Sequence, residues 1–144
     1  GVATPLIVHW PAGFKAKGEL RHAPSHIIDI VPTCLSAAGL SVNGMEGKSL
    51  LPVFVRDSKE ERTLYWEHEG NRAVRKGNYK LVAMHDAPWE LYDMNKDRSE
   101  LNDLSKKMIG KAKELRFLYE AWAKRVGALS WNEVMVTRKK KIKK

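Results

Sequence analysis

The pattern of apolar positions in the first third of the chain predicts one strand and one short helix joined by loops. Residues 5–10 are nearly all apolar and end at Pro11-Ala12-Gly13, which is typical of a buried strand in a parallel or mixed sheet. Residues 13–24 have no periodic apolar face, so they predict an exposed loop. A good N-cap residue, Asp29, and a terminating Gly39 then bound a short helix. We expect this helix to cover one face of the sheet.

Short β-prone runs after the charged stretch at residues 56–62 predict an antiparallel sheet. These runs are separated by turn-rich breaks, and they lie at residues 63–66, 72–75, 79–84 and 90–92. Gly77-Asn78 between two of them is a hairpin signal. Because the connections are too short for the crossovers that parallel strands need, we expect a meander.

Helical periodicity follows from Leu104 to Val126, where apolar residues recur at spacings of three and four. Gly127 comes next as a C-terminal cap. A long helix of this kind buries its apolar face by packing on a small antiparallel sheet, which makes the fold class α+β. We expect three parts: an α/β end segment at residues 1–55, the sheet and helix at residues 56–131, and a basic, disordered tail at residues 132–144.

Length and composition fit an ordinary globular protein. The chain has 144 residues, 43% of them hydrophobic and 30% charged, so it is long enough to bury a core as one compact unit. A single cysteine, Cys34, excludes an intrachain disulfide. No apolar run approaches the roughly 18 residues that span a bilayer. Since the chain begins at Gly1 without a charged and then an apolar segment, we expect any signal peptide to lie outside it.

The positive charge is concentrated at the C-terminal end. The formal net charge is +9, from 26 basic and 17 acidic residues. Six basic residues and no acidic one lie in residues 138–144, which leaves +3 for the rest of the chain. A high net charge favours an anionic partner such as nucleic acid, but a nearly balanced body with a basic tail is more typical of a solvated tail. The tail also has no aromatic residue among its charges, which argues against nucleic-acid binding.

Most residues with reactive or metal-binding side chains are predicted to be structural. Cys34 has no Cys or His at metal-ligand spacing, so we expect a buried thiol. His9 lies in the apolar strand, where a partly buried, hydrogen-bonded histidine is expected. His22 and His26 are separated by Pro24, which prevents a continuous helix from presenting both to one metal. Four acidic residues lack the order of a calcium loop and predict local turns and helix capping; they are Asp93, Asp97, Glu100 and Asp103.

The densest polar cluster, residues 67–72, lies where the first strand of the sheet meets a glycine-containing turn. Strand alternation places Glu67 and Glu69 on one side and His68 on the other. One interpretation is a rim that contacts a substrate, and another is a carboxylate pair for acid and base catalysis. A third is a solvated hairpin end whose carboxylates form ion pairs with nearby arginines.

Several ordered segments resemble the C-terminal third of arylsulfatases, and together they extend over residues 1–131. They include Thr4-Pro5-Leu6-Ile7-Val8-His9-Trp10-Pro11, Asp29-Ile30-Val31-Pro32-Thr33, Glu46-Gly47-Lys48-Ser49-Leu50-Leu51-Pro52 and Trp66-Glu67-His68-Glu69-Gly70-Asn71-Arg72. The resemblance implies the last part of a large α/β domain followed by a small antiparallel sheet with a helix packed on it.

Members of this family hydrolyse sulfate esters with a formylglycine made from a Cys or Ser, beside a divalent cation that is commonly calcium. The resemblance implies that the aldehyde hydrate attacks sulfur while the cation and basic side chains neutralise the sulfate oxygens. Cys34 lies in Pro32-Thr33-Cys34-Leu35-Ser36, which does not match the family's C/S-x-P-S-R motif. The family's aspartate and asparagine cation ligands have no counterpart either. No catalytic residue and no metal ligand is therefore assigned to this chain.

The resemblance also implies how the chain contributes to an enzyme. The family's C-terminal subdomain leans over the mouth of the active site, so the turn with His68, Glu69, Asn71 and Arg72 is expected to line the substrate pocket. The implied partners are the N-terminal catalytic part of the same protein and a sulfated small molecule or carbohydrate, without nucleic acid or a membrane span. The implied location is the periplasm or the extracellular space.

The sequence therefore predicts the C-terminal part of a sulfatase that is inactive by itself. One alternative is a related hydrolase of the alkaline phosphatase superfamily that acts on phosphonate monoesters or phosphodiesters. Another alternative is a basic module that binds nucleic acid or another polyanion, with salt-dependent binding that is lost when residues 138–144 are deleted.

Overall fold

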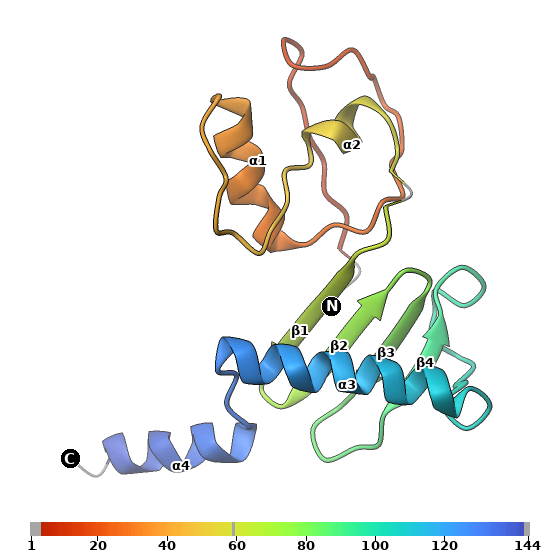
Figure 1. Ribbon diagram of the computed structural model, residues 1–144, viewed down its shortest axis with the longest axis vertical. Coiled ribbons are helices and arrows are strands. Elements are labelled where there is room, and N and C mark those ends of the chain that lie inside the picture. Colours follow the sequence, from red (N-terminus) through yellow and green to blue (C-terminus); the bar gives the residue numbers. More distant parts are fainter. Residues whose placement is uncertain (1–3, 59, 143–144) are drawn as a thin grey trace. The chain divides into compact units, whose positions relative to one another are not determined.

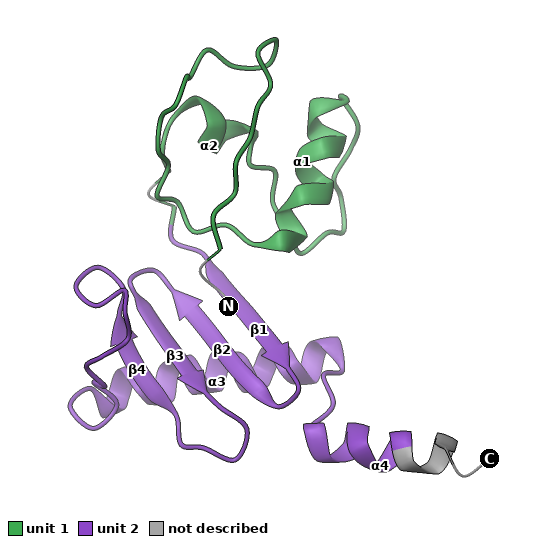
Figure 2. Cartoon of the chain, turned by 180° about the vertical axis from the view of Figure 1, so that it is seen from behind, with its two compact units in different colours: residues 1–60 green, residues 61–144 purple. Residues whose placement is uncertain are grey.

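The computed structural model describes residues 4–58 and 60–142, and from residue 139 onward only the backbone. The chain forms two compact units, residues 1–60 and 61–144, rather than the single unit that its length suggests (Figure 2). The change from one unit to the other falls within the charged stretch at residues 56–62. In the described part of the chain, every helix is too short or too polar to cross a membrane.

The first unit consists of loops and short helices (Figure 1). The 3-10 helix η1 (Ile27–Asp29) leads into α1 (Ile30–Ala37), and α2 (Leu51–Val55) follows. The predicted helix is confirmed, but η1 extends it toward the N-terminus. The N-cap residue of η1 is His26, whose ring Nδ1 accepts a hydrogen bond from the backbone N–H of Ile28 at 3.3 Å. The Asp29 carboxylate accepts one from the backbone N–H of His26 at 2.8 Å, which completes a capping box. Asp29 is therefore the third residue of the helical segment that begins with η1, and His26 is the N-cap of that segment.

Residues 5–10 form no strand in the described structure, so the prediction of a buried strand is wrong. These residues are exposed, and Ile7 retains 91% of its accessible surface. His9, expected to be partly buried, is exposed with its neighbours. The N–H and C=O groups of a strand need a neighbouring strand, and the sheet of the described residues is formed by residues 63–93 of the other unit.

The second unit contains the antiparallel meander that the sequence predicts. Its strands pair in chain order, and they are β1 (Thr63–His68), β2 (Asn71–Lys76), β3 (Tyr79–Ala83) and β4 (Glu90–Asp93). Gly77 has a φ of +55° in the tight turn between β2 and β3, where glycine meets no steric penalty. The predicted hairpin at Gly77-Asn78 is confirmed.

The long helix α3 (Ile109–Val126) lies across one face of this sheet (Figure 1). It begins later than Leu104, where the apolar periodicity starts, because residues 105–107 form a turn. It ends as predicted at Gly127, whose left-handed φ of +69° is that of a C-terminal cap. The predicted α+β arrangement of a helix on a small meander is confirmed.

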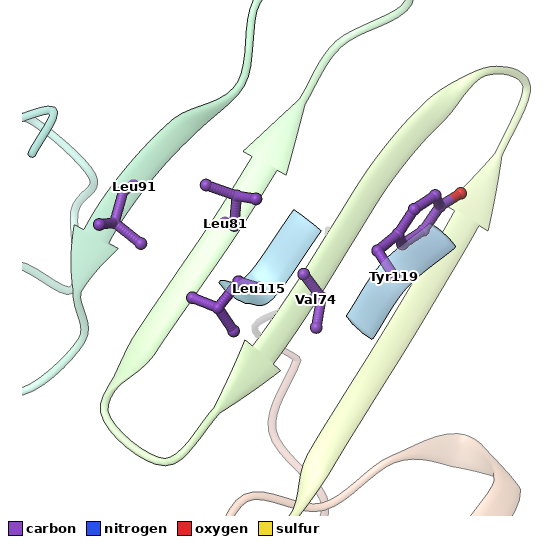
Figure 3. Close-up of a cluster of buried hydrophobic side chains, with 5 residues drawn as sticks. All are labelled: Val74, Leu81, Leu91, Leu115 and Tyr119. Atoms are coloured by element: carbon purple, nitrogen blue, oxygen red, sulfur yellow. The ribbon is translucent and has the colours of Figure 1, made fainter. Parts of the chain in front are cut away.

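The core of the second unit lies between this helix and the sheet. Figure 3 shows Val74, Leu81 and Leu91 from three strands gathered with Leu115 and Tyr119 from α3. Val74 pairs with Leu81 and Leu81 with Leu91 in the strand register, so all three side chains point to the same face. The face of the sheet that carries these residues is therefore the one that α3 covers.

The tail that the sequence predicts to be disordered forms a further helix, α4 (Trp131–Ile142). The N–H and the hydroxyl of Ser130 both donate to the carboxylate of Glu133, at 2.8 and 2.6 Å, and the N–H of Glu133 donates back to that hydroxyl at 3.3 Å. This S-x-x-E capping box is a helix start signal that lies just before the basic run. The same prediction for residues 143–144 lies outside the described residues.

Candidate functional site

The polar cluster at residues 67–72 forms the end of the hairpin between β1 and β2. Glu69 and Gly70 make the turn with positive φ values of 52° and 84°. The carboxylate of Glu67 accepts a hydrogen bond from the backbone N–H of Gly70 at 2.9 Å, which closes the turn. Because β1 ends at His68, the turn rather than strand alternation sets the direction of the Glu69 side chain.

The four candidate pocket residues do not share one face of the sheet. Arg72 pairs with Glu67 in the strand register, on the face that α3 covers, whereas His68 pairs with Asn71 on the opposite face. His68, Glu69 and Asn71 are exposed, and Arg72 is half-buried. The hairpin end thus presents three of the four side chains to solvent and keeps the fourth toward the helix.

Arg72 lies in an aromatic environment at the edge of the core. Its guanidinium lies over the ring of Trp89, 4.8 Å from the centroid, which is a cation–π contact. Its Nε is buried and has no hydrogen-bond partner in the described structure. Burial raises the pKa of Tyr119 to about 12, and the charge of Glu67 adds to this rise while that of Arg72 opposes it. Both charges therefore act on the helix side of the sheet.

Asn71 connects the hairpin end to the loop between β3 and β4. Its amide nitrogen donates to the carbonyl of His68 at 2.9 Å, and its amide oxygen accepts from the backbone N–H of His85 at 3.1 Å. The His85 ring lies against the turn, since a Cβ on Gly70 would be 2.6 Å from its Nδ1. We call the surface formed by His68, Glu69, Asn71 and His85 the hairpin-end surface.

His85 is the member of this surface that the sequence does not reveal. It is 14 residues from Asn71, and no motif links the two positions. The pairing of β2 with β3, with Arg72 opposite Ala83, is what brings His85 next to Asn71. The imidazole Nε2 lies 3.3 Å from the Asp86 carboxylate. Only the strand register, once known, would have pointed to this histidine.

The remaining candidates do not form a site. Cys34 is exposed, so the expectation of a buried thiol is wrong; of the residues in α1, only Pro32 is buried. In the acidic strip, Asp97 accepts hydrogen bonds from the backbone N–H groups of Leu101 and Asn102, which lower its pKa and confirm the predicted local turn. Nowhere in the described residues do three His, Cys, Asp or Glu side chains come together in a way that could hold a metal ion.

The ordered sequence segments and the meander with its helix define a class of protein. A family model described as "N-sulphoglucosamine sulphohydrolase, C-terminal" matches residues 1–121. The chain belongs to this family of sulfatase C-terminal regions. The resemblance to the C-terminal part of sulfatases is thereby confirmed.

Two curated relatives and one solved structure illustrate the likeness. An N-acetylglucosamine-6-O-sulfatase of Bacteroides thetaiotaomicron is 33% identical over 134 residues, which cover 81% of this chain and 24% of the relative. Arylsulfatase K of Danio rerio is 32% identical over 116 residues, which cover 70% of this chain and 22% of the relative. A protein solved in complex with its substrate D-glucosamine-2-N,6-O-disulfate has a TM-score of 0.51 and 26% identity, covering 67% of this chain and 23% of that one.

The chain spans about a quarter of the length of the curated relatives it matches. Sulfatases generally hold their formylglycine and divalent metal in the catalytic domain. The residues described here fit neither group, because Cys34 lacks the surrounding motif and the acidic side chains do not converge on a metal site in this part of the chain. A C-terminal region of this family belongs with an N-terminal catalytic part.

Proposed function

We propose that this chain is the C-terminal subdomain of an enzyme that hydrolyses sulfate esters of carbohydrates, and that the hairpin-end surface contacts the sugar. The match to the sulphohydrolase family over residues 1–121 carries the proposal. The similarity to an N-acetylglucosamine-6-O-sulfatase supports a sulfated sugar as substrate. Aryl sulfates are a second candidate substrate, supported by the similarity to arylsulfatase K.

The chemistry of the hairpin-end surface suits sugar hydroxyl groups. The Asn71 amide and the two imidazoles of His68 and His85 offer both donors and acceptors, and the Glu69 carboxylate accepts hydrogen bonds. Neutralising the sulfate oxygens during hydrolysis is a task for the cation and basic groups of the catalytic part. The surface of this chain acts by orienting the sugar, so its loss weakens substrate binding more than it slows the chemical step.

Arg72 has a different role in this proposal. Its guanidinium is held over Trp89 on the helix side of the sheet and therefore does not belong to the exposed surface. We assign it as a positioning residue, because it lies on the strand that starts at Asn71 and packs against the core beside the turn. An Arg72→Lys change keeps the charge but loses the planar stacking, so it is expected to alter the hairpin before it alters any sugar contact.

The test uses the enzyme that contains both this chain and a catalytic part. His68→Ala and Glu69→Ala are compared with the unmodified enzyme on N-acetylglucosamine 6-sulfate and on 4-nitrophenyl sulfate. Each variant is expected to raise KM for the sulfated sugar about tenfold with a nearly unchanged kcat, and to change the aryl substrate less. Both side chains are exposed, so thermal unfolding should stay the same.

Asn78→Ala is the matched control. Asn78 is exposed in the turn between β2 and β3, at the other end of β2 from Asn71, and its replacement should leave both KM values unchanged. Unchanged kinetics of His68→Ala and Glu69→Ala on several sulfated sugars would contradict the proposed contact. An unmodified enzyme that cleaves phosphonate monoesters or phosphodiesters but no sulfate ester would contradict the proposed activity.

The proposal includes the expected cofactors and location of the enzyme. Formylglycine and calcium or another divalent cation would be supplied by the catalytic part, and removal of the cation with a chelator should abolish hydrolysis without unfolding residues 61–144. We place the enzyme in the periplasm or outside the cell, where sulfated polysaccharides occur. Fractionation of the producing cells tests this location. Sulfatase activity found only in the cytoplasm would contradict it.

A further inference from the structure

A half-buried tryptophan, Trp131, lies beside the hairpin-end surface. A Cβ on Gly70 would be 3.0 Å from the Cβ of Trp131 and 2.6 Å from the Nδ1 of His85. The β1–β2 turn, the loop after β3 and the start of α4 therefore meet at this glycine. Trp131 is the first residue of α4, whereas the family match ends at residue 121. The match thus assigns this tryptophan no role.

The backbone of Trp131 is held by hydrogen bonds on both sides. Before it, the N–H and the hydroxyl of Ser130 donate to the carboxylate of Glu133. After it, the N–H of Val134 donates to the carbonyl of Ser130 at 3.1 Å and closes the first turn of α4. A side chain that starts from a bonded helix turn is positioned before any ligand binds, which lowers the entropy cost of binding.

The indole of Trp131 is not used by the core, in contrast to two other tryptophans of the second unit. The ring of Trp122 stacks on Tyr65 with 5.0 Å between centroids, and that of Trp89 contacts Tyr119 at 5.4 Å. Among the described residues, no aromatic ring, cation or hydrogen bond engages the Trp131 indole. Because the side chain is only half-buried, part of it is open to a ligand.

The side chains at this place combine an aromatic ring with neutral and acidic hydrogen-bonding groups. A pyranose ring has apolar faces made of C–H groups and a polar edge made of hydroxyl groups. Ligand sites pair aromatic surface with a few placed polar groups in the same way. The hairpin-end surface and Trp131 include no lysine or arginine, so together they suit the sugar ring rather than a sulfate group.

We propose that Trp131 stacks on the apolar face of the sugar ring whose hydroxyl groups the hairpin-end surface binds. This inference rests on the proposed function and deepens it, because it adds a residue that determines specificity for a sugar. It also separates two tasks, since this chain recognises the pyranose ring and leaves the sulfate group to the catalytic part. N-acetylglucosamine without sulfate is therefore a ligand of this surface.

NMR of the indole N–H groups in the isotope-labelled 144-residue chain tests the inference. The chain is titrated with N-acetylglucosamine, N-acetylglucosamine 6-sulfate and sodium sulfate. The Trp131 signal is the one that Trp131→Phe and Trp131→Leu both remove. It should shift with both sugars, at affinities within about threefold of each other, and should not shift with sodium sulfate.

The two variants separate stacking from packing. Both keep the Cβ that lies against the turn, but only phenylalanine keeps a planar ring. Affinity for the sugars, measured from the backbone amide signals of Asn71 and His85, should fall about fivefold in Trp131→Leu and less than twofold in Trp131→Phe. Equal weakening by the two variants would mean that Trp131 only supports the turn, which would overturn the inference.

Trp10→Leu is the matched control. Trp10 is 37% exposed and lies in the first unit, so its replacement should leave the affinity for both sugars unchanged. An equal loss in Trp10→Leu and Trp131→Leu would overturn the inference. So would a Trp131 signal that responds to neither sugar, or one that shifts as much with sodium sulfate as with the sulfated sugar. The signal in the unmodified chain gives this result even where a variant loses its fold.

The binding measurement involves no reaction and no catalytic part, so it can fail independently of the proposed function. If the enzyme hydrolyses a sulfated sugar but the Trp131 signal responds to no sugar, only the inference about Trp131 is wrong. If Trp131 binds the sugar and the enzyme cleaves no sulfate ester, the sugar contact stands and the proposed activity is wrong.

Discussion

The buried carboxylate of Asp29 accepts a hydrogen bond from the backbone N–H of Lys48, 19 residues further along the chain, at 2.9 Å. Its other oxygen accepts one from the N–H of His26 at 2.8 Å. The loop at Gly47 approaches the helix start so closely that a Cβ there would lie 2.0 Å from the carbonyl oxygen of Ile28. One carboxylate thus joins the start of the helical segment to the loop before α2.

Replacing Asp29 by alanine should destabilise the first unit. The backbone N–H groups of His26 and Lys48 would lose their acceptor at a partly buried site, which costs about 2 kcal/mol in the free energy of unfolding. Amide hydrogen exchange of residues 26–50 measures this loss within the unit itself. Asp57→Ala is the control, because Asp57 accepts hydrogen bonds from the N–H groups of His22 and Ala23 but is exposed, so water can replace it. Equal losses in the two variants would show that burial of Asp29 is not the cause.

A second prediction concerns the ion pair between Lys80 and Glu100. The Lys80 Nζ lies 2.5 Å from the Glu100 carboxylate, and the Lys80 side chain is only 6% exposed. Glu100→Ala leaves a buried ammonium group without its partner and should lower the free energy of unfolding by about 3 kcal/mol in urea denaturation. Adding Lys80→Met to the same chain should recover much of the loss, because no unpaired charge is then buried.

Glu114→Ala provides the comparison for this pair. It removes the partner of Lys76, at 2.9 Å, in a pair whose two side chains are both 37% exposed. Exposed ion pairs contribute little to stability, so the loss should be much smaller than that of Glu100→Ala. A Lys80→Met, Glu100→Ala chain that is no more stable than Glu100→Ala alone would mean that lost packing, and not the unpaired charge, accounts for the effect.

The sheet and α3 are predictable from sequence because their signals are local. Gly77-Asn78 sets a tight turn with the required positive φ, and Gly127 ends a helix whose apolar spacing is continuous. The segment at residues 5–10 has an equally clear apolar pattern but no partner strand among the described residues. A pattern of this kind predicts a preference for the extended state, while a strand also needs a neighbour to accept its hydrogen bonds.

The candidate site is less predictable, for two physical reasons. His85 reaches Asn71 only through the register of β2 and β3, which is not encoded near either residue. The separation of Arg72 from His68 follows from strand alternation, but the sequence alone does not say which face the helix covers. The capping box of Ser130 and Glu133 is a local start signal for α4, in the segment that the sequence analysis predicts to be a disordered tail.

A third prediction compares two turn glycines that both have a positive φ. Gly70→Ala puts a Cβ 2.6 Å from the His85 ring in a turn with a φ of +84°, and Gly77→Ala puts one 2.4 Å from a carboxylate oxygen of Glu61 at a φ of +55°. Alanine in the left-handed region of φ is less stable than glycine by about 1 kcal/mol, and this lowers the free energy of unfolding of both variants. Gly70→Ala should cost about 1 kcal/mol more in urea denaturation, because its Cβ also lies 3.0 Å from the Cβ of Trp131, whereas Gly77→Ala meets the end of a flexible Glu61 side chain.

Gly70→Ala should also loosen the start of α4. Trp131 packs against the same turn, so amide hydrogen exchange in α4 should become faster in this variant and stay unchanged in Gly77→Ala. Equal exchange rates in the two variants would mean that the turn does not anchor the helix.

The last prediction concerns alkaline pH. Burial raises the pKa of Tyr119 from 10.0 to about 12, so the folded state holds the phenol proton more tightly than the unfolded state does. The stability associated with this group is therefore complete below pH 10 and is lost as the pH rises from 10 toward 12. Ultraviolet absorbance of tyrosinate should show a titration near pH 12 that Tyr119→Phe removes, while the still later titration of Tyr92, whose pKa burial also raises, remains. Glu67→Gln should move this titration to lower pH, because the charge of Glu67 opposes ionisation of the phenol; an unchanged titration would place Glu67 too far from Tyr119 to share the helix side of the sheet.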